Sequence, residues 1–152
     1  NVLRTGNKAI AAATLLADAG KAIIAVLIAR YFWGETAAQI AGLFAFMGHV
    51  WTFWLGFKGG KGVAAMIGAL LALSWQVGLL FCATWLFIAV VRRISSLAAI
   101  TAALTAPLFA YAFANLQLAL IAAMMGLILV FRHGENISRL LSNTEPRIGA
   151  KK

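Results

Sequence analysis

The sequence predicts an all-α fold, a polytopic membrane bundle of about six transmembrane or partly spanning helices. Of the 152 residues, 63% are hydrophobic and 11% are charged, and the mean hydropathy is +0.93. A soluble domain of this size cannot bury so much apolar surface. The runs Thr36–Phe57, Gly62–Val91 and Ile94–Phe131 carry no charge, and each reaches the roughly 20 residues that a spanning helix needs. We therefore expect one membrane-embedded domain over residues 1–152.

The helices are expected in order along these runs. The first should extend from about Lys8 to Trp33, and the second should lie within Thr36–Phe57. The run Ile94–Phe131 is too long for one span, and the turn-forming stretch ANLQ at residues 114–117 divides it into two helices. Pro107 should kink the helix that precedes this turn.

The run Gly62–Val91 has two interpretations, one tilted helix or a hairpin of two helices, 62–73 and 76–91. A single helix would place Arg92 and Arg93 outside the cell, against the positive-inside rule. The hairpin places all the basic residues except Lys21 and Arg30 on one side, so we favour the hairpin and a Gly-rich loop that faces the cytoplasm.

The net charge of +9 fits the same topology. In a soluble protein it would suggest nucleic acid, but here membrane orientation explains it, and we expect membrane lipid and no nucleic acid as partner. The one cysteine, Cys82, excludes an internal disulfide.

The predicted topology also brings four polar segments to one membrane face. They could converge on one site, or they could be ordinary flanking loops of the cytoplasmic side. The segments are NVLRTGNK (1–8), GFKGGKG (56–62), RRISS (92–96) and FRHGENISRLLSNTEPR (131–147).

The segment GFKGGKG has the composition of a phosphate cradle. Its glycines let backbone N–H groups approach an anion, the run from Val63 offers a helix N-terminus, and Lys61 adds a cation. It is not a P-loop, because the spacing differs and no Ser or Thr follows the lysine. A flexible turn is the alternative interpretation.

The last polar segment carries His133, Asn136 and Arg139 at spacings of three. If the helix continues beyond Phe131, these side chains share one face. Histidine can exchange a proton, asparagine can hold a hydroxyl and arginine can bind phosphate bidentately, which suits a polyol phosphate. A solvated helix with capping side chains is the alternative.

Asp18, Lys21 and His49 are further ionisable residues within predicted spans. Asp18 and Lys21 are three apart and of opposite sign, so we expect them to pair as a structural brace, with a supporting role near the active face. We interpret His49 as a hydrogen-bonded structural histidine rather than a ligand.

Several chemistries are excluded. The sequence has no zinc-binding spacing, no H-E-x-x-H and no G-x-S-x-G motif. The H-x-x-x-x-D signature is also absent, because Trp54 and Ser138 stand five residues after the two histidines. With four acidic residues in all, we expect neither a metal nor a cofactor.

Four motifs occur in the order found in one known family. NVLRTGNK, GHVWTFWLGFKGGKGVA, SSLAAI and RHGENISRLLSNTEPRIG resemble the motifs of the bacterial membrane acyl-phosphate:glycerol-3-phosphate acyltransferases, the PlsY family. The resemblance runs from Asn1 almost to the C-terminus. The family has about seven helices, and its first helix and S-G-N-x-G-A-T-N loop, which includes a serine thought important, are expected upstream of residue 1.

The resemblance implies a reaction. An acyl phosphate would transfer its fatty acyl group to the sn-1 hydroxyl of glycerol 3-phosphate, which gives lysophosphatidic acid and phosphate for phospholipid synthesis without a cofactor. It also implies a multi-pass protein of the bacterial inner membrane with a cytoplasmic active site. A transporter of a small phosphorylated solute and a scaffold that binds anionic lipid are the competing hypotheses.

The resemblance assigns roles to residues at the matching positions. The catalytic set is Lys61, His133 and Asn136, and the donor phosphate is preferred slightly over His133 as the acceptor of the hydroxyl proton. Ser96, rather than Ser95, would hydrogen-bond glycerol 3-phosphate. The remaining substrate-binding and phosphate-binding residues are Asn1, Arg4, Gly59, Gly60, Gly62, Arg139 and Glu145.

Overall fold

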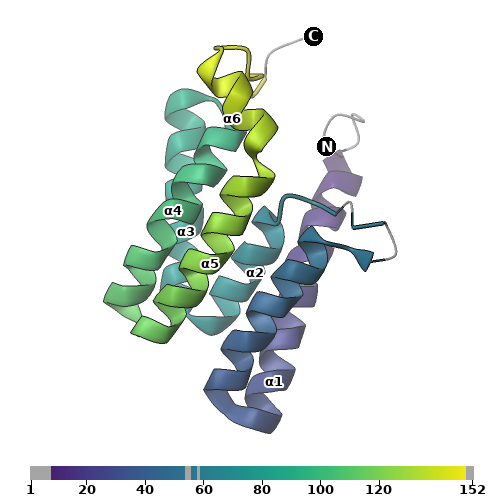
Figure 1. The fold of residues 1–152 in the computed structure, drawn as a ribbon, viewed down its shortest axis with the longest axis vertical. Helices are drawn as coiled ribbons and strands as arrows, with labels where there is room; N and C mark the ends of the chain where they lie inside the picture. Colours follow the sequence, from purple (N-terminus) through teal and green to yellow (C-terminus); the bar gives the residue numbers. More distant parts are fainter. Residues whose placement is uncertain (1–7, 54–55, 58, 150–152) are drawn as a thin grey trace. The chain divides into compact units, whose positions relative to one another are not determined.

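The computed structural model describes residues 8–53, 56–57 and 59–149. Their regular secondary structure is helical throughout, in six elements labelled α1 to α6 (Figure 1). The chain forms two compact units, Asn1–Leu73 and Ser74–Lys152. The predicted all-α fold is confirmed.

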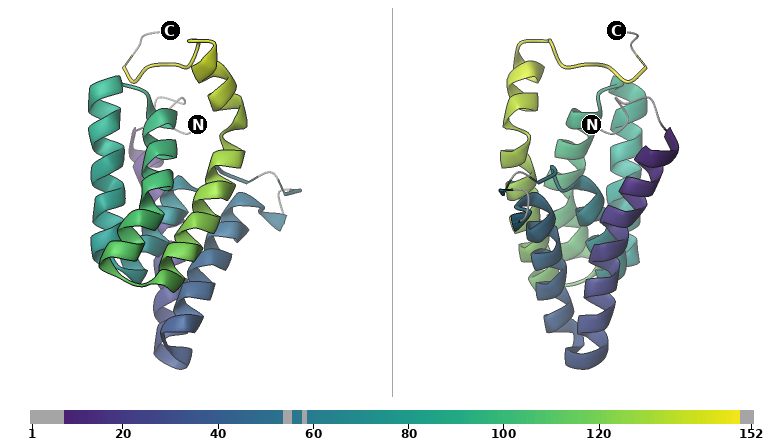
Figure 2. Two further views of the ribbon diagram at one scale, coloured as in Figure 1. Left: turned by 60° about the vertical axis from the view of Figure 1, so that its left-hand side comes forward. Right: turned by 90° about the vertical axis from the view of Figure 1, so that its right-hand side faces the viewer.

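The first unit contains α1 (Lys8–Val50) and α2 (Val63–Leu73). α1 consists of two arms that run in opposite directions (Figure 2), because Gly34 breaks the helix with φ 81° and ψ −171°. This backbone conformation is almost confined to glycine. The two arms correspond to the two helices expected on either side of this position.

The second arm of α1 ends at Val50, inside the uncharged run Thr36–Phe57 in which this helix was expected, so the helix is shorter than the run. The chain turns after Val50, with hydrogen bonds from the Gly56 N–H to the Phe53 carbonyl and from the Phe57 N–H to the Thr52 carbonyl. Gly56 and Phe57 both have positive φ angles, 59° and 62°. Residues 51–57 carry no charge although they lie beyond the helix, so the length of the uncharged run does not give the length of the helix.

Arg30, near the bend of α1, holds the C-terminal end of α2. Its guanidinium donates to the Ala72 carbonyl at 2.7 Å and the Leu73 carbonyl at 3.4 Å, and it pairs with both carboxylate oxygens of Glu35 at 2.7 and 2.9 Å. The last carbonyls of a helix have no partner within it, and a cation at this end is favourable. Arg30 therefore has a structural role in this unit.

The second unit contains α3 (Trp75–Arg92), α4 (Ser95–Phe113), α5 (Leu116–Arg132) and the short α6 (Gly134–Leu141). The run from Gly62 to Val91 is therefore two helices, α2 and α3, with the extended residue Ser74 between them. The turn expected at 114–117 is also present, and the Asn115 side chain caps α5 by accepting from the Leu118 N–H at 2.8 Å.

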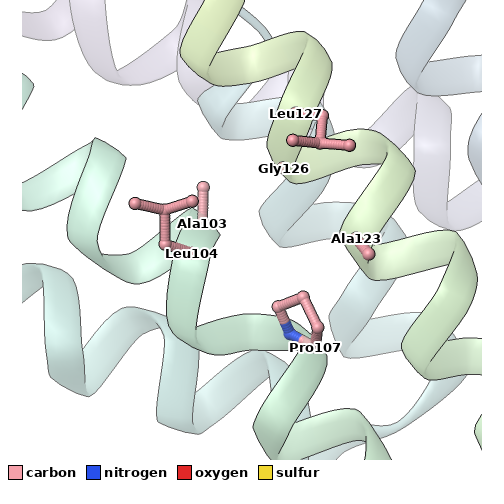
Figure 3. A pocket seen from close by; sticks show the side chains of 6 residues that line it. All are labelled: Ala103, Leu104, Pro107, Ala123, Gly126 and Leu127. Carbon is pink, nitrogen blue, oxygen red and sulfur yellow. The ribbon is translucent and has the colours of Figure 1, made fainter.

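Small residues allow α4 and α5 to pack closely. At Gly126 an added Cβ would lie 2.8 Å from the Ala103 carbonyl oxygen, which has no helical donor four residues later because Pro107 lacks an N–H. α4 continues across Pro107. An apolar hollow of about 150 Å³ lies beside this contact. Figure 3 shows its lining residues, Ala103, Leu104, Pro107, Ala123, Gly126 and Leu127.

Length and composition allow these helices to cross a membrane. α1, α3 and α4 qualify, and α5 and α6 qualify together as a pair bent by 63°. α2 has 11 residues, which is about 16 Å of helix, so it reaches only part of the way across a hydrocarbon core of about 30 Å. Partly spanning helices were part of the predicted fold.

Candidate active site

Glu145 is the centre of a polar cluster in the second unit. Its Oε1 accepts hydrogen bonds from Ser96 Oγ at 2.7 Å and from Asn136 Nδ2 at 2.6 Å, and its Oε2 accepts from Arg139 Nε at 2.7 Å. Ser96 and Asn136 are buried, and the Glu145 side chain is 8% exposed. One carboxylate therefore joins the start of α4, two positions of α6 and the C-terminal segment.

The C-terminal segment reaches this place because it is tied to the turn between α3 and α4. Arg93 ends α3 in the left-handed region, with φ 54°, and reverses the chain into α4. The Ile148 N–H donates to the Arg93 carbonyl at 2.6 Å, and Arg93 Nη2 donates to the Ile148 carbonyl at 3.0 Å. Figure 1 shows α6 at the same end of this unit as the α3–α4 turn.

Glu145 is held in its charged form. Burial disfavours the carboxylate and raises its pKa, but the hydrogen bonds from Ser96, Asn136 and Arg139 and the charge of Arg139 outweigh burial, so the pKa of Glu145 lies below its ordinary value. An ionised carboxylate only accepts hydrogen bonds. Glu145 therefore orients its three donors and would repel a phosphate placed directly against it.

His133 lies at the bend between α5 and α6 and is 2% exposed. Its Nδ1 is 2.8 Å from the Leu129 carbonyl oxygen. A carbonyl only accepts, so Nδ1 carries the ring proton and Nε2 is the acceptor of the neutral ring. This tautomer suits a side chain that holds or accepts the proton of a hydroxyl.

The continuous helix on which a common face of His133, Asn136 and Arg139 depended does not form. α5 ends at Arg132, and α6 leaves it at 63°. The His133 ring and backbone N–H both bond the Leu129 carbonyl, which satisfies the end of α5 and lets the chain change direction. Asn136 and Arg139 still converge, because both donate to Glu145.

The Gly-rich segment packs against the end of α1 in the first unit. A Cβ at Gly59 would overlap the His49 carbonyl oxygen, one at Gly60 would overlap His49 Nε2, and one at Gly62, where φ is 90°, would overlap the Phe46 ring. Close packing against the end of α1 therefore requires glycine at these three positions. Lys61, among them, is exposed, and α2 begins directly after Gly62.

The predicted residues therefore fall into three groups. The second unit contains Ser96, His133, Asn136, Arg139 and Glu145. Ser96, Asn136 and Arg139 each donate a hydrogen bond to Glu145. The neighbouring Ser95 is exposed. The first unit contributes Lys61 with its three glycines. Asn1 and Arg4 lie outside the described residues. A single site that contains both units' residues stays a prediction.

Two contacts escaped the sequence analysis. The pairing of Asp18 with Lys21 was expected and is confirmed, with 2.7 Å between Oδ1 and Nζ, but His49 also joins them. The tie between Arg93 and Ile148 had no local signal either.

In residues 8–53, 56–57 and 59–149 no group of three His, Cys, Asp or Glu side chains is arranged to hold a metal.

Comparison with known proteins gives a consistent result. The profile of the glycerol-3-phosphate acyltransferase family matches residues 1–143. Two curated relatives called glycerol-3-phosphate acyltransferase come from Ruegeria sp. (strain TM1040) and Dinoroseobacter shibae (strain DSM 16493 / NCIMB 14021 / DFL 12). The Ruegeria protein is 58% identical, with 99% of this chain and 75% of the relative covered. The Dinoroseobacter protein is 55% identical, with 100% and 75% covered.

Two solved structures are similar over nearly the whole chain. Both are crystal structures of PlsY (YgiH), an integral membrane glycerol 3-phosphate acyltransferase, and both are 36% identical to this chain. The glycerol 3-phosphate form has a TM-score of 0.92, and the matched region covers 97% of this chain and 76% of the chain in that crystal structure. The lysophosphatidic acid form has a TM-score of 0.93 and covers 98% and 78%. The chain belongs to the glycerol-3-phosphate acyltransferase family of integral membrane enzymes, as its ordered motifs indicated.

Proposed function

We propose that this protein transfers a fatty acyl group from an acyl phosphate to the sn-1 hydroxyl of glycerol 3-phosphate, which yields lysophosphatidic acid and inorganic phosphate. One observation carries the proposal. A structure similar over 97% of the chain occurs in a glycerol 3-phosphate form, and its counterpart occurs in a lysophosphatidic acid form. These two ligands differ by one acyl group on a hydroxyl, so they stand as acceptor and product of acyl transfer.

The acyl phosphate donor follows from the chemistry that the chain has to perform. The hydroxyl oxygen attacks the acyl carbonyl carbon, the bond from that carbon to the phosphate oxygen breaks, and phosphate leaves with the electron pair. Phosphate is a good leaving group, so no acyl-enzyme is required. The protein has to position two anions and stabilise the developing oxyanion.

The residues of the second unit would bind the acceptor. Asn136 and Arg139, oriented by the Glu145 carboxylate, would hold the hydroxyl and phosphate of glycerol 3-phosphate together with Ser96. The His133 tautomer supports an Nε2 atom that accepts a hydrogen bond from the attacking hydroxyl. The proton then passes to the departing phosphate or to this ring nitrogen.

The Gly-rich segment of the first unit would bind a substrate phosphate. Lys61 supplies a positive charge, and the N–H groups next to the start of α2 add the favourable field of a helix N-terminus. Asn1 and Arg4 would contribute from the first motif. The acyl chain would remain among the helices in the bilayer.

We place the protein in the bacterial cytoplasmic membrane, as a single membrane-embedded domain with its active site toward the cytoplasm. The basic residues support this orientation, because the segments 56–62, 92–96 and 131–147 hold most of the positive charge. Glycerol 3-phosphate and the acyl phosphate would reach the site from that side, and membrane lipid would take up the product.

The direct test is reconstitution of the protein in lipid vesicles with palmitoyl phosphate and labelled glycerol 3-phosphate. We expect labelled lysophosphatidic acid in proportion to phosphate release, and loss of most turnover in Lys61→Arg, since a planar guanidinium does not reproduce the compact charge and donor geometry of an ammonium. A transporter would carry label into the vesicles without forming product. That outcome, or a fully active Lys61→Arg, would reject the proposal.

A further inference from the structure

Asp18, Lys21 and His49 form a compact cluster in the first unit, where the first arm of α1 meets the end of the second. Lys21 Nζ is 2.7 Å from Asp18 Oδ1 and 2.8 Å from His49 Nδ1, and these two acceptor atoms are 3.2 Å apart. Ionisable groups within a membrane span are costly and are usually retained for a function. The cluster is therefore more than the brace that its sequence spacing predicts.

The geometry fixes the tautomer of His49. A protonated lysine can only donate, so its contact with Nδ1 makes Nδ1 an acceptor and puts the ring proton on Nε2. The 3.2 Å between His49 Nδ1 and Asp18 Oδ1 is then the separation of two acceptors that share one ammonium, not a direct ion pair. His49 thus has the opposite tautomer to His133.

The other edge of the His49 ring meets the Gly-rich segment. Nε2 lies against Gly60, at a place where a Cβ would overlap it, and the His49 carbonyl accepts from the Gly60 N–H at 3.2 Å. Gly59 packs on the same carbonyl oxygen. Ring and backbone of one residue therefore hold two consecutive glycines, and Lys61 follows them directly.

We propose that Lys21, anchored by Asp18, fixes the His49 ring against Gly60 and so positions the Gly-rich segment and Lys61 for a substrate phosphate. The three residues are positioning residues that act through the segment. This inference rests on the proposed function only for the nature of the ligand, a substrate phosphate. The chain of contacts from Lys21 through His49 to Gly60 lies within the first unit alone.

The tautomer can be measured directly, because the chain has two histidines. In ¹⁵N spectra of ring-labelled protein we expect one ring protonated at Nε2 and the other, His133, protonated at Nδ1. In Lys21→Met the Asp18 carboxylate should draw the His49 proton to Nδ1, and the amide signals of Gly59 and Gly60 should shift. An unchanged His49 tautomer with unshifted glycine amides would overturn the proposal, whether or not the protein turns over substrate.

Kinetics distinguish positioning from mere stability. With a folded, purified Lys21→Met we expect KM for the substrate bound by the Gly-rich segment to rise by about tenfold, since small displacements of a binding group have large effects. His49→Gln keeps an acceptor and a donor and should retain more activity than His49→Leu. Thr14→Val is the matched control. Among the interactions described for residues 8–53, 56–57 and 59–149, the Thr14 hydroxyl donates only to the Ile10 carbonyl of its own helix.

A double substitution completes the test. Gly60→Ala should displace the His49 ring by itself, so adding Lys21→Met should cost little more than Gly60→Ala alone. Additive effects of the two substitutions on KM would contradict the coupling. Equal activity of His49→Leu and His49→Gln would contradict a role for the ring nitrogens.

Discussion

At the scale of single residues, one largely buried carboxylate organises the polar cluster of the second unit. Glu145 accepts hydrogen bonds from three side chains that sequence motifs assign to substrate binding. Its negative charge fits this role because its partners are all donors, and hydrogen bonds to a charged group stabilise more than neutral ones. The Glu145 carboxylate thus supports the side chains of Asn136 and Arg139.

Replacement of Glu145 by glutamine should lower the free energy of unfolding by about 2 kcal/mol, because a neutral amide loses the charge-assisted bonds and places an NH2 group among the three donors already present. Turnover should fall as well, since Asn136 and Arg139 lose their orientation. Thermal unfolding in detergent and the acyl-transfer assay measure the two effects. Glu135→Gln is the control: its carboxylate is 90% exposed and 3.8 Å from Arg139 Nη1, so it should behave like the unsubstituted protein.

The lowered pKa of Glu145 predicts a pH dependence of stability. A carboxyl whose pKa is lower in the folded than in the unfolded state stabilises the fold above its unfolded pKa of about 4.3, and this contribution disappears as the pH falls through the folded value. The unfolding temperature should therefore drop below about pH 4, more steeply than in Glu145→Gln. Parallel curves for the two proteins would exclude Glu145 as the titrating group.

At the scale of helices, the glycine-like backbone of Gly34 sets the bend of α1. Gly34 and Gly20 both have open space where a Cβ would be added, but only Gly34 has a positive φ. Gly34→Ala should thus cost about 1 to 3 kcal/mol of stability through backbone strain. Gly20→Ala, in the helical part of the same element, should be neutral or slightly stabilising. Equal unfolding temperatures for the two variants would contradict this account of the bend.

The tie between the C-terminal segment and the α3–α4 turn gives a further prediction. Arg93→Asn keeps a side chain that tolerates the left-handed conformation but loses the guanidinium bond to the Ile148 carbonyl. Hydrogen exchange at the Ile148 amide should accelerate by about two- to tenfold, the effect of one hydrogen bond. Arg92→Asn is the matched control, and equal acceleration in both variants would show that the tie is not made by Arg93.

The helices were predictable where a local signal marks their ends. The turn before α5 was expected from the composition of residues 114–117, and the break between α2 and α3 was expected from the positive-inside rule. The end of α1 at Val50 and the bend at His133 were not, because the first depends on glycine contacts with His49 and the second on a ring that bonds a carbonyl of the preceding turn. Neither contact leaves a trace in charge or hydropathy.

The candidate site shows the same division. Ordered motifs identified Ser96, Asn136, Arg139 and Glu145, which the second unit brings together. The contact of Lys21 with His49 joins residues of two different arms of α1, so no short sequence window contains it. Long-range pairs of this kind need the fold before they can be seen.

At the scale of the whole molecule, the basic residues predict the orientation of the chain in the membrane. Lys61 belongs to one unit and His133 to the other, so one catalytic site requires that the Gly-rich segment and the segment after α5 reach the same side of the bilayer. The positive-inside rule predicts that this side is the cytoplasm. Arg30 does not conflict with it, because that charge is taken up by Glu35 and the end of α2.

The most direct measurement is labelling of single cysteines with a membrane-impermeant maleimide in a Cys82→Ala background. Three exposed positions serve as reporters: Phe57→Cys for the Gly-rich segment, Ser138→Cys for α6 and Trp33→Cys for the bend of α1. We expect Phe57→Cys and Ser138→Cys to react only in inside-out vesicles and Trp33→Cys only in right-side-out vesicles. Reaction of Phe57→Cys and Ser138→Cys from opposite sides would contradict a single site for both substrates.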